Sequence, residues 1–153
     1  RAIDLVLKRF KEGDIIMKET VLLYNFNDKD RLMKIRQALL PLGFRVKTVG
    51  REDYGKPLGT LAGVKGMEEL TEADHSGDGL CSDFDDEMAV LAGLTSSQVD
   101  SFIRTLRKKG VGRIDYKAVL TSVNKDWDSV HLYHEIKKEH EAMTAADREN
   151  VLD

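Results

Sequence analysis

Two stretches of this chain, residues 21–49 and residues 89–120, carry the same order of structural signals. Each begins with an apolar run, passes through a polar turn into a segment with apolar residues at helical spacing, and ends with a glycine and a second short strand-like run. Such an order is typical of strand–helix–strand units. An internal repeat limits the fold more than a single motif does, because both copies predict the same supersecondary unit.

The ends of the two predicted helices carry residues with capping roles. Asn27 and Asp28 follow the first strand, and their side chains can accept hydrogen bonds from the free amides of a helix start. In the second half, Thr95 and Gln98 have the spacing of a capping box. Pro41 is a poor residue for a helix interior, so the last turn of the first helix is predicted to be irregular.

Composition limits the class of protein. A length of 153 residues indicates one domain, and 41% hydrophobic with 33% charged residues is ordinary for a globular chain. The net charge of −3 argues against nucleic acid as a partner, because phosphate binding needs clustered positive charge. No apolar run is long enough to cross a bilayer, and no export leader is visible. We therefore expect a cytoplasmic protein with no membrane partner.

The repeat also suggests how the chain is organised. We expect a single domain over residues 17–145, made of two related halves at about 20–66 and 86–143, which an acidic linker at 67–87 joins. Residues 1–16 are interpreted as an N-terminal extension, because the repeated pattern begins after them. The alternative is that they form a packed N-terminal helix.

The acidic linker contains the only metal candidates of the sequence. In a calcium-loop alignment, oxygen ligands fall at Asp74, Ser76, Asp78 and Asp85. The last position holds the shorter Asp where such loops have a bidentate Glu, and the nearby run Met88–Leu91 has the pattern of a strand instead of a helix. A solvated acidic linker is therefore favoured over a calcium site.

No group of residues has the spacing of a catalytic site. GxSxG does not occur, and the single Cys81 lies among carboxylates, which disfavour the thiolate that a nucleophile needs. His131, His134 and His140 fall on a predicted helix at about 127–143 without forming HExxH, and are interpreted as part of a charged, solvent-facing surface. The sequence therefore assigns no catalytic residue, no cofactor and no cofactor-binding residue.

Trp127, the one tryptophan, opens this last helix. It occupies the place in the second half that Tyr54 has in the first. We expect a structural ring that covers the end of the sheet.

The second half also carries a family resemblance. The residues that carry it are Glu87–Leu94, Leu106–Gly110, Arg113–Thr121, Asn124, Trp127 and Leu132–His140. Over about residues 86–143 the pattern resembles a small bacterial family known only as a domain of unknown function. The resemblance implies a small bacterial intracellular protein and assigns neither an activity nor a site.

Strand–helix–strand twice over gives the order β-α-β-β-α-β. We predict an α+β fold with a duplicated βαβ unit, a ferredoxin-like antiparallel sheet with its helices on one face. The alternative is a four-stranded doubly wound α/β sheet, in which the segment after the first half is a crossover helix. Glycines interrupt that segment, which favours the first arrangement.

Three classes of function remain open. The favoured class is a non-enzymatic binding or regulatory module that recognises an unknown protein or small molecule, with a homodimer as one assembly. The second is an enzyme with a cleft between the halves. The third is a nucleic-acid binder that uses a local basic cluster, made of Arg104, Arg107, Lys108, Lys109 and Arg113.

Overall fold

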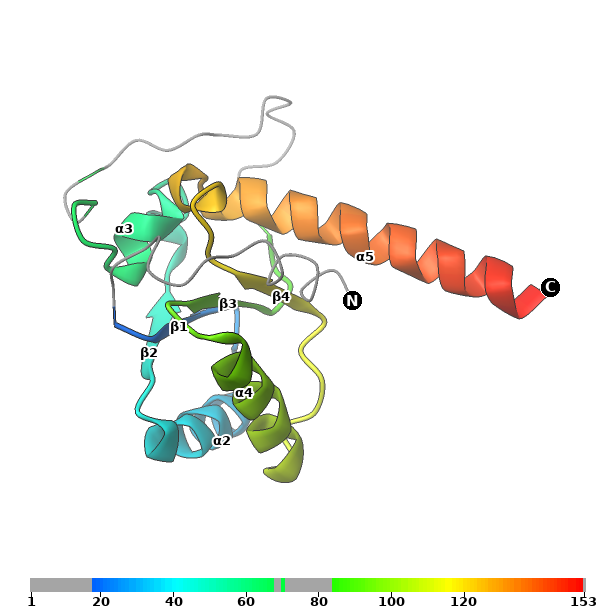
Figure 1. The fold of residues 1–153 in the computed structure, drawn as a ribbon, viewed down its shortest axis with the longest axis horizontal. Helices are drawn as coiled ribbons and strands as arrows, with labels where there is room; N and C mark the ends of the chain where they lie inside the picture. The colour runs from blue at the N-terminus through cyan, green and yellow to red at the C-terminus, as the bar shows by residue number, and fades with distance from the viewer. Residues whose placement is uncertain (1–17, 68–69, 71–83, 153) are drawn as a thin grey trace.

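The four strands form one open sheet in the order β2-β1-β3-β4 (Figure 1). They are β1 Thr20–Tyr24, β2 Arg45–Val49, β3 Met88–Ala92 and β4 Tyr116–Val119. The α-helices are α2 Lys29–Leu39, α3 Leu58–Ala62, α4 Ser96–Lys108 and α5 Ser129–Leu152. This computed structural model describes residues 18–67, 70 and 84–152, with side chains as far as residue 143.

The sheet is mixed. Strand β1 pairs with β2 in parallel, β3 pairs with β4 in parallel, and the two central strands β1 and β3 are antiparallel. The α+β class is confirmed, but the predicted antiparallel sheet is wrong. Each of α2 and α4 carries the chain back across the sheet, so the strand that comes after it lies parallel to its neighbour. The doubly wound alternative is wrong too, because the central pair is antiparallel.

Helices cover both faces of the sheet, and the prediction of helices on one face is therefore wrong (Figure 1). Along β1, Val21 and Leu23 pack in a core with α2 and α4, whereas Leu22 and Tyr24 pack in a second core with α3 and α5. All five residues of β1 are buried, as are all five of β3. Strands that are apolar on both faces need a helical layer on each side.

The two halves share backbone features at equivalent places. The residue after the first strand has a left-handed backbone in both, Asn25 with φ 62° and Gly93 with φ 78°. In each half, the glycine that follows the helical segment also has a left-handed backbone: Gly43 with φ 77° after the 3-10 turn, and Gly110 with φ 72° after α4. The capping box of Thr95 is confirmed. So is the irregular end of the first helix, which tightens into a 3-10 turn at Leu40–Leu42.

Two reciprocal hydrogen bonds join the halves. A 3-10 turn comes after the second strand of each half, Arg51–Asp53 in one and Asn124–Asp126 in the other. Tyr54 ends the first of these turns and Trp127 the second. The carbonyl of Tyr54 accepts from the amide of Ser129 at 3.1 Å, and the carbonyl of Trp127 accepts from the amide of Leu58 at 2.9 Å. The first amide of each of the next helices is therefore satisfied by the opposite half.

Helix α5 begins two residues later than predicted and ends beyond the predicted limit of residue 143. Its first turns pack on the sheet through buried Val130, Tyr133 and Ile136, and its C-terminal half projects away from the body (Figure 1). The ring of Trp127 is partly buried against this core. None of the helices among the described residues combines the length and the apolar character needed to cross a membrane.

Candidate functional site

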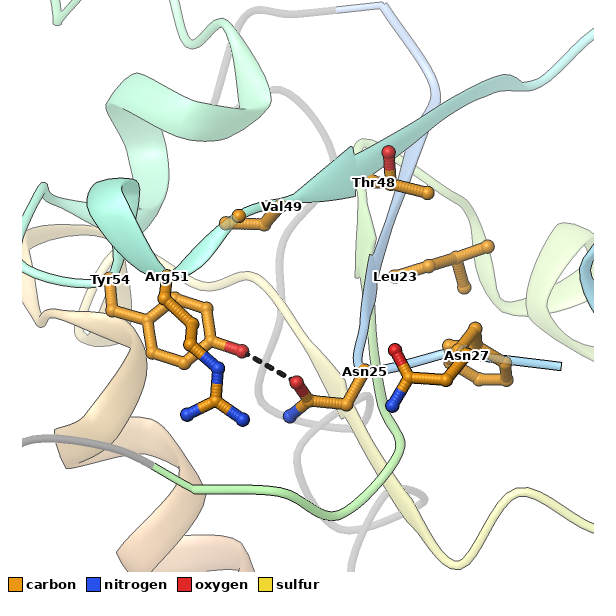
Figure 2. Close-up of a pocket in the computed structure, with 9 residues that line it drawn as sticks. Leu23, Asn25, Asn27, Thr48, Val49, Arg51 and Tyr54 are labelled. Carbon is orange, nitrogen blue, oxygen red and sulfur yellow. Dashed lines mark hydrogen bonds between the residues drawn. The ribbon is translucent and has the colours of Figure 1, made fainter.

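A pocket of about 240 Å³ lies at the carboxyl ends of the parallel strands β1 and β2 (Figure 2). Its lining consists of Leu23, Asn25, Phe26, Asn27, Thr48, Val49, Gly50, Arg51 and Tyr54. Thr48, Leu23 and Val49 come from the two strands, and the other lining residues come from the turns that leave the strands. This end of a parallel pair is where open α/β sheets hold their ligands, because the chain leaves both strands there and the turns flank a crevice.

Asn25 organises the floor of the pocket. It is the one non-glycine residue of the described chain with a positive φ, a conformation that Asn tolerates better than other side chains. Its amide nitrogen donates to the carbonyls of Phe84 and Asp86 at 2.9 and 3.1 Å, and its amide oxygen accepts from the hydroxyl of Tyr54 at 3.1 Å (Figure 2). Asn25 thus ties the end of β1 to the segment that leads into β3.

The pocket is backed by an aromatic cluster that contains all four tyrosines of the chain. Phe84 stacks on Tyr54 with ring centroids 4.9 Å apart and on Tyr133 at 4.3 Å. Tyr24 lies against both Tyr54 and Phe84, and Tyr116 meets Tyr133 edge to face. Such contacts hold rings in fixed positions. Tyr54, which lines the pocket, is therefore packed against this cluster.

Burial raises the pKa values of three tyrosines of this cluster, Tyr24, Tyr54 and Tyr116. The ring of Tyr24 is fully buried, and its desolvation raises the pKa far above the ordinary value, although the hydrogen bond with Ser129 at 2.8 Å acts in the opposite direction. Burial also raises the pKa of Tyr54, and its hydrogen bond to Asn25 offsets part of that effect. Tyr54 therefore stays protonated at neutral pH and acts as a hydrogen-bond donor.

Arg51 supplies the positive charge at the mouth of the pocket. Its guanidinium forms an ion pair with Asp85, and this hydrogen bond is the main cause of a raised pKa of Arg51. Both side chains are exposed, at 52% for Arg51 and 89% for Asp85. An ion pair this exposed to water stabilises the fold little, so its partners can exchange.

The lining can bind polar groups but holds few that could transfer a proton. Arg51, Asn27 and Thr48 offer a guanidinium, an amide and a hydroxyl, and they come from three different segments (Figure 2). Among the described residues that line the pocket there is no carboxylate, imidazole or thiol. These donors suit the recognition of an acceptor-rich group.

Of the four metal candidates, only Asp85 is in the described part of the chain. Its carboxylate meets Arg51 at the pocket mouth. Asp74, Ser76 and Asp78 lie outside the described residues, as do Cys81 and residues 1–16. Within the described part, no three His, Cys, Asp or Glu side chains are grouped so that they could hold a metal ion.

The three histidines of α5 differ from the predicted solvent-facing surface. Each is half-buried and contacts a ring. His131 stacks on Trp127 with centroids 4.1 Å apart, and His140 meets Tyr116 edge to face at 5.3 Å. They are not brought to one point, because each faces a different aromatic neighbour.

The sequence did not single out the pocket residues Asn25, Thr48 and Arg51. A usable signal was the Asn25–Asp28 turn directly after an apolar strand, because Asn is one of the few residues that accept a left-handed backbone there. Thr48 and Arg51 carry no comparable local signal. They reach the site only because β2 lies parallel to β1.

Comparison with known proteins gives one match. Residues 87–143 match the model of a Domain of unknown function (DUF3783). This confirms the resemblance seen over about residues 86–143. No curated protein and no solved structure matches the chain. The DUF3783 match covers β3, α4, β4 and α5 as far as Met143, whereas the pocket residues all precede it.

Proposed function

We propose that this protein is a non-enzymatic binding or regulatory module, and that the pocket at the ends of β1 and β2 holds a small molecule with a carboxylate or phosphate group. The observation that carries the proposal is that Arg51, Asn27 and Thr48 all line one pocket at this end of the sheet. The pocket volume of about 240 Å³ limits the ligand, or the part of it that enters, to a small molecule.

Asp85 shows the kind of group that the pocket mouth accepts. Its carboxylate pairs with Arg51 while remaining largely in water. A guanidinium presents a planar fork of donors that suits carboxylate and phosphate equally. A ligand anion can therefore take the position of the Asp85 carboxylate and gain further hydrogen bonds from Asn27 or Thr48.

Binding is favoured over catalysis by the chemistry of the lining. General acid–base chemistry at neutral pH needs a group that titrates near that pH, and Tyr54 is held in its protonated form. The alternative is an enzyme whose site lies in a cleft between the halves. It draws support from the pocket mouth, where Arg51 of the first half meets Asp85 of the connecting segment.

We also propose that the halves arose from one βαβ unit by duplication and form a single domain. The reciprocal hydrogen bonds of Tyr54 and Trp127, and the matched left-handed residues Asn25 and Gly93, support this origin. The second half has diverged at its own strand end. There, the side-chain oxygen of Asn124 accepts a hydrogen bond from the backbone amide of Thr121, and its side-chain nitrogen donates to the carbonyl of Val119.

A ligand screen followed by calorimetry tests the proposed pocket. Small carboxylates, phosphates and size-matched neutral amides are screened by ligand-detected NMR, and hits are titrated calorimetrically. We expect hits among the anions. Arg51→Gln should weaken binding about tenfold or more, since hydrogen bonds to a charged group are worth that factor. Asp85→Asn should strengthen binding, because it removes one internal competitor for Arg51.

Arg104→Gln is the matched control. It removes the same charge from an exposed position on α4, away from the pocket. Equal effects of Arg51→Gln and Arg104→Gln would show that only the net charge matters. Turnover of a hit by the wild-type protein would support the enzyme alternative instead.

A further inference from the structure

The outer face of the α2–α4 layer gathers exposed cations although the whole chain has a net charge of −3. We call this surface the basic helical face, and its members are Lys29, Lys34 and Arg36 on α2, and Arg104, Arg107, Lys108 and Lys109 at the end of α4. All seven side chains are exposed. Only the four from α4 belonged to the cluster seen in the sequence.

The fold brings the two sets of cations together. Helices α2 and α4 pack side by side on the same face of the sheet, and they run in opposite directions because β1 and β3 are antiparallel (Figure 1). The contacts of Arg31, near the start of α2, show which ends of the two helices lie together. Its guanidinium donates to the carbonyl of Val111 and, at 3.1 Å, to the carbonyl of Arg113. The start of α2, with Lys29, therefore lies beside the end of α4.

These charges are little neutralised by neighbours. None of the seven side chains forms an ion pair within the described residues. The acidic residues on the two helices are Asp30 and Asp100, both exposed. Arg113, in the loop after α4, is outside the set because it pairs with Asp115 at 3.3 Å. Residues three or four positions apart on a helix have Cβ atoms about 5–6 Å apart, so cations at this spacing can act together on one polyanion.

We propose that the basic helical face binds the phosphate backbone of double-stranded nucleic acid, independently of sequence. Charge complementarity selects this partner, since a duplex carries one negative charge for about every 1.7 Å of its axis. The face offers cations but no exposed aromatic ring among the described residues, because the tyrosines lie with Trp127 in the opposite layer. Contact with phosphates is therefore favoured over base stacking.

An anionic membrane is a less suitable partner. Surface-bound helices bury an apolar face below the lipid headgroups. Here only Met33 and Leu40 are exposed large apolar residues on α2 and the turn after it, and α4 has none. Leu40 also lies at the end of α2 that is remote from Lys29.

Fluorescence anisotropy with a labelled 20-base-pair DNA duplex, at salt concentrations between 50 and 200 mM, tests the proposal on the full chain. We expect binding by the wild-type protein that weakens steeply with salt. The variant Arg104→Gln/Arg107→Gln/Lys108→Gln should lower the steepness of log K against log salt by about three, and lower the affinity about tenfold or more at low salt. Two duplexes of unrelated sequence should bind equally.

The matched control removes the same charge from the opposite layer, as Lys65→Gln/Lys125→Gln/Lys138→Gln. We expect its affinity within about threefold of wild type, because only the long-range field changes. Circular dichroism establishes that both triple variants are folded. Equal losses in the two variants, or no binding by the wild-type protein at 50 mM salt, would overturn the proposal.

Two further measurements distinguish nucleic acid from other possible partners of this surface. Binding to vesicles that contain anionic lipid, without binding to the duplex, would assign the face to a membrane and refute the nucleic-acid proposal. Displacement of the duplex by polyglutamate at equal charge concentration would show that the basic helical face binds anions in general, and would also refute the nucleic-acid proposal. Arg51→Gln should leave duplex binding unchanged, so this proposal and the pocket proposal can fail separately.

Discussion

Replacing Arg31 by Met should destabilise the protein more than any other single change of a charged side chain on α2. Arg31 is largely buried, with 20% of its side chain exposed. Its Nε donates to both carboxylate oxygens of Glu87, at 3.2 and 3.0 Å, and its other nitrogens donate to the carbonyls of Val111 and Arg113. One side chain of the first half therefore forms hydrogen bonds with three residues of the second half.

The expected cost derives from these contacts. Hydrogen bonds that involve a charged group contribute about 1.5–3 kcal/mol each, but these bonds are only partly buried or exposed, so water can replace Arg31 at some of the released acceptors. We therefore expect a loss of about 2–4 kcal/mol in the free energy of unfolding. Arg31→Lys should lose about half as much, because an ammonium keeps the charge without the planar fork.

Urea unfolding, monitored by circular dichroism, measures the loss as a lower midpoint at an unchanged slope. Arg36→Met is the matched control, since Arg36 lies on the same helix but is exposed. It should change stability by no more than about 0.5 kcal/mol. If Arg31→Met is equally harmless, the four hydrogen bonds do not join the halves in solution.

Three further outcomes are expected. Asn25→Ala should cost about 1 kcal/mol more than Asn25→Gly, because both lose the amide contacts but only Ala is strained at φ 62°; urea midpoints give the difference. Above pH 10 stability should fall by about 1.4 kcal/mol per pH unit through Tyr24, because the unfolded chain loses that proton first, and Tyr24→Phe should flatten this decline in alkaline urea titrations. Trp127→Ala should cost about 2 kcal/mol and not the larger value of a fully buried ring, and the folded wild-type emission should be blue-shifted relative to the unfolded chain.

The helices and strands could be predicted from the sequence, because their signals are local. The apolar stripe, Pro41 and the Thr95 capping box act within one or two turns. The order and direction of the strands in the sheet could not be predicted, because parallel and antiparallel strands are built from the same kinds of residue. One overlooked signal was the uninterrupted apolar run of β1 and β3, which indicates strands covered on both faces.

The candidate surfaces show the same division. The cations of α4 were visible as a cluster in the sequence, but Lys29, Lys34 and Arg36 join them only because α2 packs beside α4. The pocket depends on the parallel alignment of β1 and β2, which places Thr48 opposite Leu23. Neither arrangement has a signature within one segment of the chain.

The antiparallel central pair has a consequence for how the chain folds. Leu22 pairs with Lys47 within the first half and with Val90 across the centre, so the second contact closes a loop of 68 residues and the first a loop of 25. Closing the longer loop costs about 0.9 kcal/mol more in chain entropy. We therefore expect each βαβ unit to form early and the β1–β3 seam to close last. The rate-limiting barrier then reports on this seam, so changes at Leu22 or Val90 should slow folding more than changes within α2 or α4.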